Sequence, residues 1–244
     1  MSTNIDALVD ALPSLWRGIV VTIELTAGGG LLAFLLAVVL GTAVRVRSLP
    51  IRFVVRVLIE FFRGTSLVVQ LFWLFYVLPL FGYQLDPMLC GVLALGLNYG
   101  AYGAEVVRGA LDAVPAGQLE AAVALNFNAR QRLTRVVFPQ AWAMMIPSLG
   151  NFLIHLLKGT AFASFITLQD LTAGIVDLQK TTGATIFSFG IGLVIYFVLA
   201  YLVSLLINLA EARAKHRLGR GPSLREVLRF RPASADTVRG GVSL

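Results

Sequence analysis

Five long apolar runs, separated by short polar stretches, dominate the chain. A membrane-spanning helix needs about 20 mostly apolar residues, and each run approaches or exceeds that length. The pattern predicts an all-α polytopic membrane protein with five transmembrane helices between about residues 16 and 210. The start of the second span is the least sharply defined, because a preceding apolar stretch can extend it. The predicted spans are Ile19–Val44, Thr65–Phe81, Met88–Val107, Ala141–Phe162 and Ala184–Leu209.

Composition supports a lipid environment. Hydrophobic residues make up 57% of the chain and charged residues only 14%, with a mean hydropathy of +0.82. A soluble domain carries roughly 25% charged residues, so this chain has more apolar surface than a soluble core can bury. The single cysteine, Cys90, lies inside an apolar run, so we expect neither an intrachain disulfide nor a metal site.

The distribution of basic residues predicts the orientation in the membrane. Seventeen of the 20 lysines and arginines fall in the first loop and the approach to span two, in the connection between spans three and four, or in the tail. Positive residues are retained on the cytoplasmic side. Residues 1–15 are therefore expected outside, and residues 211–244 form a basic cytoplasmic tail that begins helical and becomes largely disordered. Contact with anionic lipid explains the net charge of +7, and we expect no nucleic-acid binding.

The connection from about residue 108 to 140 is too regular to be a simple linker. Two stretches of helix-forming residues, Gln118–Leu125 and Ala129–Phe138, are separated by a turn at Asn126–Asn128, and Pro139 is expected to end the second helix. One interpretation is an amphipathic hairpin that anchors the bundle at the membrane surface. The other is a protruding element that fits a groove on a partner protein. The residues alone leave both open.

This connection resembles the EAA loop of binding-protein-dependent ABC importer permeases. That loop carries Glu-Ala-Ala, here Glu120, Ala121 and Ala122, then a glycine, and a proline near its end, here Pro139. Asn126 stands where the family usually has glycine, but asparagine tolerates the left-handed backbone conformation that glycine supplies. We therefore expect the turn to form.

The likeness extends over roughly residues 16–210 and narrows to permeases of the polar amino acid type, which serve histidine, glutamate, glutamine, arginine, opines and related compounds. It implies a type I ABC importer fold in the bacterial cytoplasmic membrane. The strings that carry the likeness outside the loop are Phe62–Phe72, Asn98–Glu105, Arg108–Gly109, Val114–Pro115, Gly117–Gln118, Leu156–Thr160 and Leu168–Leu171.

The resemblance also implies the partners. The coupling residues, Glu120, Ala121, Ala122, Asn126 and Pro139, would contact a cytoplasmic ABC ATPase dimer. A second permease, identical or related, would complete the pathway, and an extracytoplasmic solute-binding protein would deliver a polar amino acid or related solute. The chain has no Gly-x-x-x-x-Gly-Lys-Ser/Thr phosphate loop, so we expect it to bind no cofactor and to leave ATP and Mg²⁺ to the partner ATPase.

Two polar stripes are candidates for the solute pathway. Charged and polar side chains inside spans are costly and are expected to face water or protein. Facing stripes would line a cavity for a zwitterionic solute. The alternative is that these side chains join helices through hydrogen bonds, with the charged members extending towards the span ends. The stripes repeat at spacings of four and three and comprise Asn98, Tyr102 and Glu105 on span three and Asn151, His155 and Lys158 on span four.

Two other functional classes fit less well. An ion-coupled secondary transporter would need carboxylates near the bilayer centre, whereas the acidic residues here lie mostly at span ends. A membrane enzyme would need clustered histidine, aspartate or cysteine, yet the two histidines and one cysteine lie far apart in the chain. The sequence favours transport driven by a partner.

Overall fold

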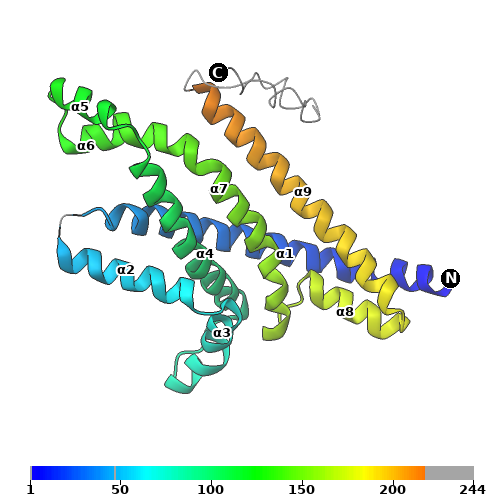
Figure 1. The fold of residues 1–244 in the computed structure, drawn as a ribbon. Helices are drawn as coiled ribbons and strands as arrows, with labels where there is room; N and C mark the ends of the chain where they lie inside the picture. The colour runs from blue at the N-terminus through cyan, green and yellow to red at the C-terminus, as the bar shows by residue number, and fades with distance from the viewer. Residues whose placement is uncertain (1, 47, 218–244) are drawn as a thin grey trace, which may run out of the picture.

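The computed structural model describes residues 2–46 and 48–217, which are almost entirely helical and contain no strand (Figure 1). Six helices have twelve or more residues: α1 (Ser2–Ala43), α2 (Leu49–Gly64), α4 (Pro87–Asp112), α7 (Phe138–Gly159), α8 (Leu171–Thr182) and α9 (Thr185–Arg217). The shorter elements are α3 (Leu67–Phe72), α5 (Ala116–Ala124), α6 (Ala129–Gln131), the π-helical turns η1 (Trp73–Val77) and η3 (Arg132–Val137), and the 3₁₀ helices η2 (Leu78–Phe81) and η4 (Thr160–Ile166).

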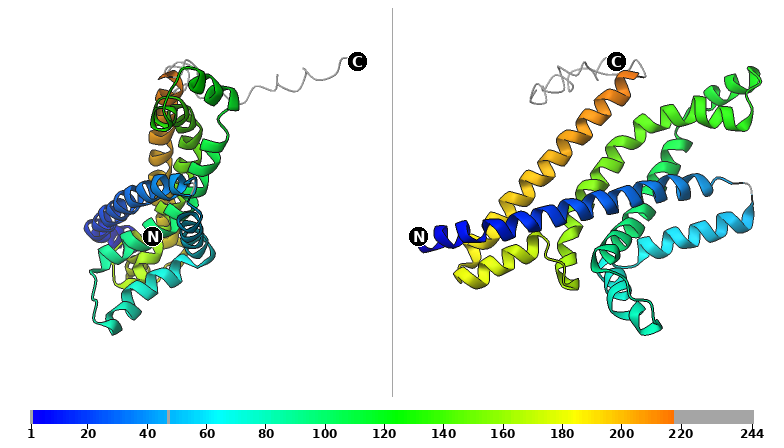
Figure 2. Two further views of the ribbon diagram at one scale, coloured as in Figure 1. Left: turned by 90° about the vertical axis from the view of Figure 1, so that its left-hand side faces the viewer. Right: turned by 180° about the vertical axis from the view of Figure 1, so that it is seen from behind.

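α1 is the helix against which most of the other helices pack. It runs obliquely across the other helices and contacts α4 along much of its length, as Figures 1 and 2 show. At Gly41 the two helices are so close that an added Cβ would lie 2.7 Å from the carbonyl oxygen of Ala104 and 2.8 Å from Cβ of Val107. Only glycine permits this approach. α1 begins at Ser2, so the described part of the predicted outer segment is a continuation of the first span.

Three helical stretches among the described residues are long and apolar enough to cross a membrane, namely Asn4–Ala43, Ala129–Ile166 and Thr185–Ala214. The pair Leu49–Gly64 and Leu67–Phe81 becomes a fourth if it is counted as one bent span. α4, the predicted third span, has the required length, but its glycines, tyrosines and Asn98 lower its hydropathy. The multi-pass character is clear, and the count of five remains a prediction.

The second predicted span contains a sharp break. The helical stretch before it and the one after it meet at an angle of 101°. The turn falls at Thr65 and Ser66, both of which have extended backbone conformations. The apolar residues before Thr65 therefore belong to a separate helix, α2, rather than to a straight extension of the span.

Pro139 does not end a helix, so that prediction was wrong. α6, η3 and α7 follow one another without a break, and Pro139 lies in the first turn of α7. Proline lacks a backbone N–H and is poorly tolerated within a regular helix. Here the preceding π-helical turn changes the hydrogen-bond spacing, and the missing donor falls at a position where the helix changes type.

α8 and the far end of α9 complete the arrangement. α8 was not predicted, although Asp170 caps its start by accepting a hydrogen bond from the Ala173 amide at 3.0 Å and Gly183 ends it with a φ of +66°. α9 extends through the predicted start of the tail to Arg217, and residues 218–244 lie outside the described residues. α5, α6 and the C-terminal end of α9 lie at one end of the molecule, and the N-terminal end of α1 and α8 lie at the other (Figures 1 and 2).

Candidate functional site

The first candidate site is the helix-turn-helix formed by α5 and α6. α5 ends in a Schellman motif, in which the amide of Asn126 donates to the Val123 carbonyl at 2.9 Å and the amide of Phe127 donates to the Ala122 carbonyl at 3.0 Å. This motif requires a left-handed residue, and Asn126 has a φ of +58°. The expectation that asparagine can replace glycine in this turn is confirmed.

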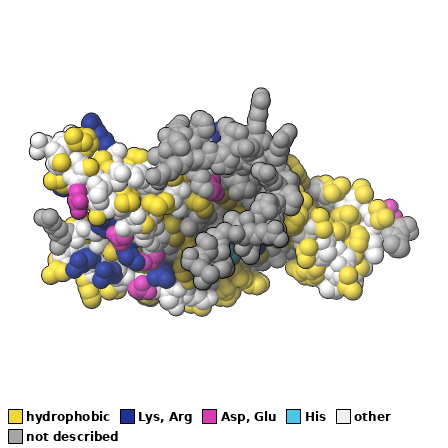
Figure 3. Space-filling model, turned by 45° about the horizontal axis from the view of Figure 1, so that its top comes forward, with side chains coloured by type: hydrophobic (Ala, Val, Ile, Leu, Met, Phe, Trp, Pro, Cys, Tyr) yellow, Lys and Arg dark blue, Asp and Glu magenta, His cyan; other side chains and the backbone are white. Residues whose placement is uncertain are grey.

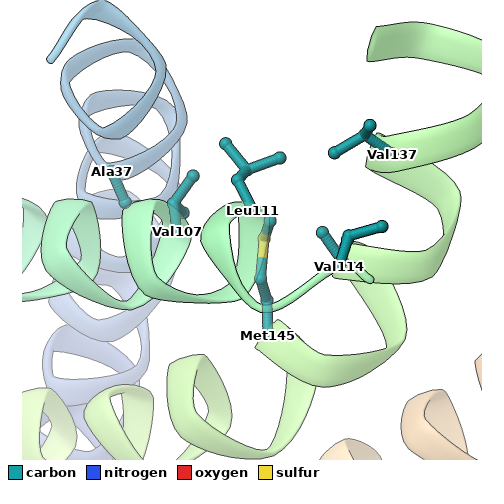
Figure 4. Close-up of a cluster of buried hydrophobic side chains, with 7 residues drawn as sticks. Ala37, Val107, Leu111, Val114, Val137 and Met145 are labelled. Carbon is teal, nitrogen blue, oxygen red and sulfur yellow. The ribbon is translucent and has the colours of Figure 1, made fainter. Parts of the chain in front are cut away.

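The underside of α5 is anchored in a hydrophobic cluster. Ala122 is only 2% exposed, and Leu119 packs against the cluster that contains Val114 and Val137. Figure 4 shows Val114 and Val137 close together where the chain leaves α4 and enters η3. The cluster therefore joins α5 to the ends of α4 and α7. The remaining buried members are Ala37, Val107, Leu111, Ala141 and Met145.

The opposite face of α5 is open. Glu120 and Ala121 are exposed, and Val123 and Leu125 are 51% and 68% exposed. Within the described ranges, Glu120 forms neither an ion pair nor a hydrogen bond, whereas several other carboxylates at this end are paired. In Figure 3 most of the visible charged side chains gather on the left of the molecule, where the ends of α1 and α2 and the α5–α6 loop lie. An unpaired carboxylate beside exposed apolar residues is suited to contact with another protein.

A continuous helical path leads from this face into the membrane region. Asn128 and Gln131 form a capping box, with two reciprocal hydrogen bonds of 2.9 Å, that fixes the start of α6. The helix then continues through η3 into α7. On α7, Trp142 stacks on Phe138 and meets Phe34 of α1 edge to face. Pro139 is exposed within this path and Ala121 lies on the open face, so four of the five predicted coupling residues are accessible.

The polar stripe on α4 faces the break between α2 and α3. The Asn98 side chain is buried and donates from Nδ2 to the carbonyl of Phe62 at 3.0 Å. The Tyr102 hydroxyl donates to the carbonyl of Arg63 at 3.0 Å. These two residues therefore make the interhelical hydrogen bonds that were the alternative interpretation of the stripe.

Glu105, the third member of that stripe, belongs to a chain of ion pairs. Its carboxylate lies 2.7 Å from the guanidinium of Arg108, which also contacts Asp112 at 3.3 Å. Asp112 in turn pairs at 3.0 Å with Arg45, which lies just beyond the end of α1. This network joins the end of α4 to the end of α1 at the same end of the molecule as the helix-turn-helix.

The stripe on α7 is open to the surroundings. Asn151, His155 and Lys158 are all exposed, and their side chains make no hydrogen bonds or ion pairs with other described residues. A groove of about 640 Å³ in the described part is lined almost entirely by apolar residues of α1, α7 and α9 and contains none of the six predicted residues. Their role in a solute pathway remains a prediction.

Two polar residues at the break escaped the sequence analysis. Gln70 donates from Nε2 to the carbonyl of Phe62 at 2.9 Å and to Oγ1 of Thr65 at 2.7 Å. Arg63 lies over the ring of Tyr102, with 5.5 Å between its Cζ and the ring centroid. A signal was present in the sequence, since Arg63 precedes and Gln70 follows the small and polar segment Gly64–Ser66 between two mostly apolar stretches. Among the described residues no group of three or more histidine, cysteine, aspartate or glutamate side chains is placed to hold a metal ion.

Comparison with known proteins gives a consistent result. Residues 29–216 match the family described as "Binding-protein-dependent transport system inner membrane component". The probable amino-acid ABC transporter permease protein y4tF of Sinorhizobium fredii is 48% identical over 160 residues, which is 63% of this chain and 67% of that protein. The L-cystine transport system permease protein TcyB of Bacillus subtilis is 36% identical over 202 residues, covering 82% of this chain and 86% of the relative.

A solved structure supports the same fold. The crystal structure of an amino acid ABC transporter with histidines contains a chain that is similar to this one with a TM-score of 0.78 and 33% sequence identity. The similarity covers 84% of this chain and 96% of that one.

Proposed function

Since the chain belongs to the family of binding-protein-dependent transport system inner membrane components, we propose that it is the permease subunit of an ATP-driven importer of polar amino acids or related small solutes. Relatives named as amino-acid and L-cystine permeases support this solute class. The comparisons favour this function and give no support to an ion-coupled secondary carrier.

The importer has further components. A cytoplasmic ABC ATPase dimer hydrolyses ATP, a second permease copy or a related subunit completes the translocation path, and an extracytoplasmic solute-binding protein delivers the solute. The protein lies in the bacterial inner membrane. The arginines near the α5–α6 loop support an orientation in which this loop faces the cytoplasm, with the N-terminus outside and the C-terminus inside.

The observation that carries the proposal is the exposed face of α5 and its rigid connection to the membrane helices. Glu120, Ala121 and the exposed apolar residues beside them fit a groove on the ATPase. When the ATPase dimer closes around nucleotide, α5 moves, and the cluster below it and the continuous α6–α7 helix carry that movement into the bundle. The helices then alternate between outward-open and inward-open arrangements. Asn126 maintains the left-handed turn at the end of α5, and Pro139 lies where the α6–η3 segment continues into α7.

The test reverses the charge of the exposed carboxylate. Glu120→Lys should preserve the fold of the permease, because Glu120 has no partner among the described residues, but should prevent copurification with the ATPase and abolish uptake into proteoliposomes. Asp10→Lys is the matched control, since it makes the same charge change at an exposed position on the opposite end of the molecule. Normal ATPase binding and uptake by Glu120→Lys would refute the coupling mechanism.

A further inference from the structure

The first two turns of α2 carry positive charge that no other described residue neutralises. Residues 45–59 contain four arginines and no acidic residue. Arg45 is paired with Asp112 at 3.0 Å. Arg52 and Arg56, both on α2, form neither an ion pair nor a side-chain hydrogen bond with any residue that the structure describes. Their charge is available to an anionic group from outside the described chain.

The two carboxylates nearest to this part of α2 already have cations of their own. Glu60, one turn further along the helix, pairs with Arg63 at 2.8 Å. Glu105 of α4 is close enough to Arg56 to interact with its charge, but its carboxylate lies 2.7 Å from the guanidinium of Arg108. The start of α2 therefore keeps a net positive field.

The two arginines are placed to share one ligand. They are four residues apart, so they lie on the same face of the helix with about 5–6 Å between their Cβ atoms. Arg52 is partly exposed and Arg56 is exposed. The N-cap residue, Ser48, makes no side-chain cap hydrogen bond, so the positive end of the helix dipole adds to their field. A phosphate group can accept hydrogen bonds from both guanidinium groups, which match its geometry.

An exposed apolar strip begins beside these arginines and runs along α2. Phe53, Val57 and Phe61 repeat at a spacing of four and are 70%, 51% and 57% exposed. The opposite side of α2 packs on the ends of α1 and α4 through Val55 and Ile59. α2 lies at the edge of the bundle, so the strip faces the surroundings of this subunit (Figure 1). It continues from the charged start of the helix towards the break.

The charge and the strip together define the chemistry of the ligand. A soluble anion would use the two arginines but leave the apolar strip uncovered. An apolar helix of another protein would cover the strip but leave the positive charge unneutralised. An anionic phospholipid supplies both parts in one molecule, and basic clusters beside membrane helices are typical sites for such headgroups.

We propose that the start of α2 is a binding site for an anionic phospholipid, in which Arg52 and Arg56 bind the phosphate and Phe53, Val57 and Phe61 contact an acyl chain. This site goes beyond the proposed function, and only its assignment to the cytoplasmic leaflet rests on the orientation given there. Because Val55 and Ile59 hold α2 against α1 and α4, the bound lipid secures this helix from its outer side.

The experiment measures lipid binding to the full-length protein in detergent by native mass spectrometry. The probe is palmitoyl-oleoyl phosphatidylglycerol, and phosphatidylcholine with the same acyl chains is the neutral comparison. The native chain should bind the anionic lipid roughly 25-fold more tightly than the neutral lipid, because each arginine near an anionic headgroup contributes about fivefold. Glycerol 3-phosphate, which has the phosphate but no acyl chain, should not displace the lipid at the same concentration.

The variants separate the headgroup contact from the acyl-chain contact. Arg52→Gln and Arg56→Gln should each lower the preference for the anionic lipid about fivefold, and together they should abolish it. Arg52→Lys combined with Arg56→Lys keeps the charge and should retain most of the preference. Phe53→Ser combined with Val57→Ser should weaken binding of both lipids equally and leave the preference unchanged.

A second pair of arginines provides the matched control. Arg130 and Arg135 are exposed at the same end of the molecule but lie outside α2. Arg130→Gln combined with Arg135→Gln removes the same charge and should preserve the native preference. Melting temperatures without added lipid show whether each variant is folded, and if the double glutamine variant of α2 is unstable, its two single variants give the same comparison.

Three results would overturn the site. The first is an unchanged preference in the double glutamine variant of α2 or no preference in the native chain. The second is an equal loss in the Arg130 and Arg135 control, which would show a diffuse attraction to this whole end of the molecule. The third is a dimer that dissociates in the Phe53 and Val57 variant while lipid affinity stays the same, since the strip would then join two copies of the chain.

These measurements involve neither transport nor ATP hydrolysis, so they are independent of the importer function. Loss of the lipid preference leaves that function standing. A chain that binds the anionic lipid as expected, but imports no amino acid with its ATPase and binding protein, would refute the importer proposal alone.

Discussion

The turn at the end of α5 offers a quantitative test of the coupling element. Asn126 has a φ of +58°, a conformation that costs a typical side chain about 1–2 kcal/mol and is least accessible to β-branched residues. Asn126→Val should therefore destabilise the Schellman motif by about that amount. Asn126→Gly should leave it as stable as in the native chain, because glycine is the residue most often found at this position.

The effect is visible in amide hydrogen exchange. The amides of Asn126 and Phe127 are protected by hydrogen bonds to Val123 and Ala122, and these bonds open when the turn is lost. A loss of 1–2 kcal/mol raises the open fraction by a factor of about 5–30, and exchange of peptides covering residues 122–127 should accelerate by that factor. Mass spectrometry of the permease in nanodiscs provides the measurement.

A control isolates the backbone conformation from side-chain shape. Leu125→Val introduces the same β-branched residue one position earlier, where φ is −81° and the side chain is 68% exposed. It should alter exchange only slightly. Equal acceleration in Leu125→Val and Asn126→Val, or faster exchange in Asn126→Gly than in the native chain, would show that the left-handed turn does not determine the stability of α5.

Three further changes probe packing and charge. Leu111→Ala, at a side chain 1% exposed, should lower the free energy of unfolding by about 2–5 kcal/mol, seen as a lower melting temperature in detergent, whereas Leu125→Ala should change it by less than about 0.5 kcal/mol. Gly41→Ala should destabilise the α1–α4 contact. Gly109→Ala, where an added Cβ meets nothing within 4 Å, should be neutral or stabilising by up to about 1 kcal/mol. Equal melting temperatures of these two variants would contradict this expectation. Burial raises the pKa of the Asp170 carboxyl above 3.8, so the folded state holds this proton more strongly than the unfolded state does. Stability should therefore fall as the pH rises from 3.8 through the folded pKa. Asp170→Asn should remove that dependence, and an unchanged pH profile in this variant would contradict the argument.

The sequence was informative where local preference and tertiary structure agree. α5 forms from helix-forming residues and ends at an asparagine that tolerates the left-handed conformation, so both its position and its turn were predictable. The long apolar runs located α1, α7 and α9 because lipid contact imposes a minimum length. The resemblance of the EAA-type loop then identified the family.

Other features depend on contacts that no local pattern reveals. Pro139 reads as a helix end, but the π-helical turn before it allows the helix to continue. Asn98 and Tyr102 share a stripe, yet which helix that stripe faces depends on how α2 packs on α4. The 101° break was not predicted because the helical stretches on both sides of it are mostly apolar and hydropathy does not report direction.

The length of α1 has a consequence for the surrounding membrane. Its 42 residues form a rod about 63 Å long, which is twice the thickness of a ~30 Å hydrocarbon layer. The rod fits within that layer only at a tilt of about 60°, and otherwise its N-terminal turns emerge among the headgroups. Because tilt responds to bilayer thickness and α4 is packed along α1, thinner or thicker lipids change the angle of the whole bundle. Acyl-chain length is therefore a physical variable to which this protein is sensitive.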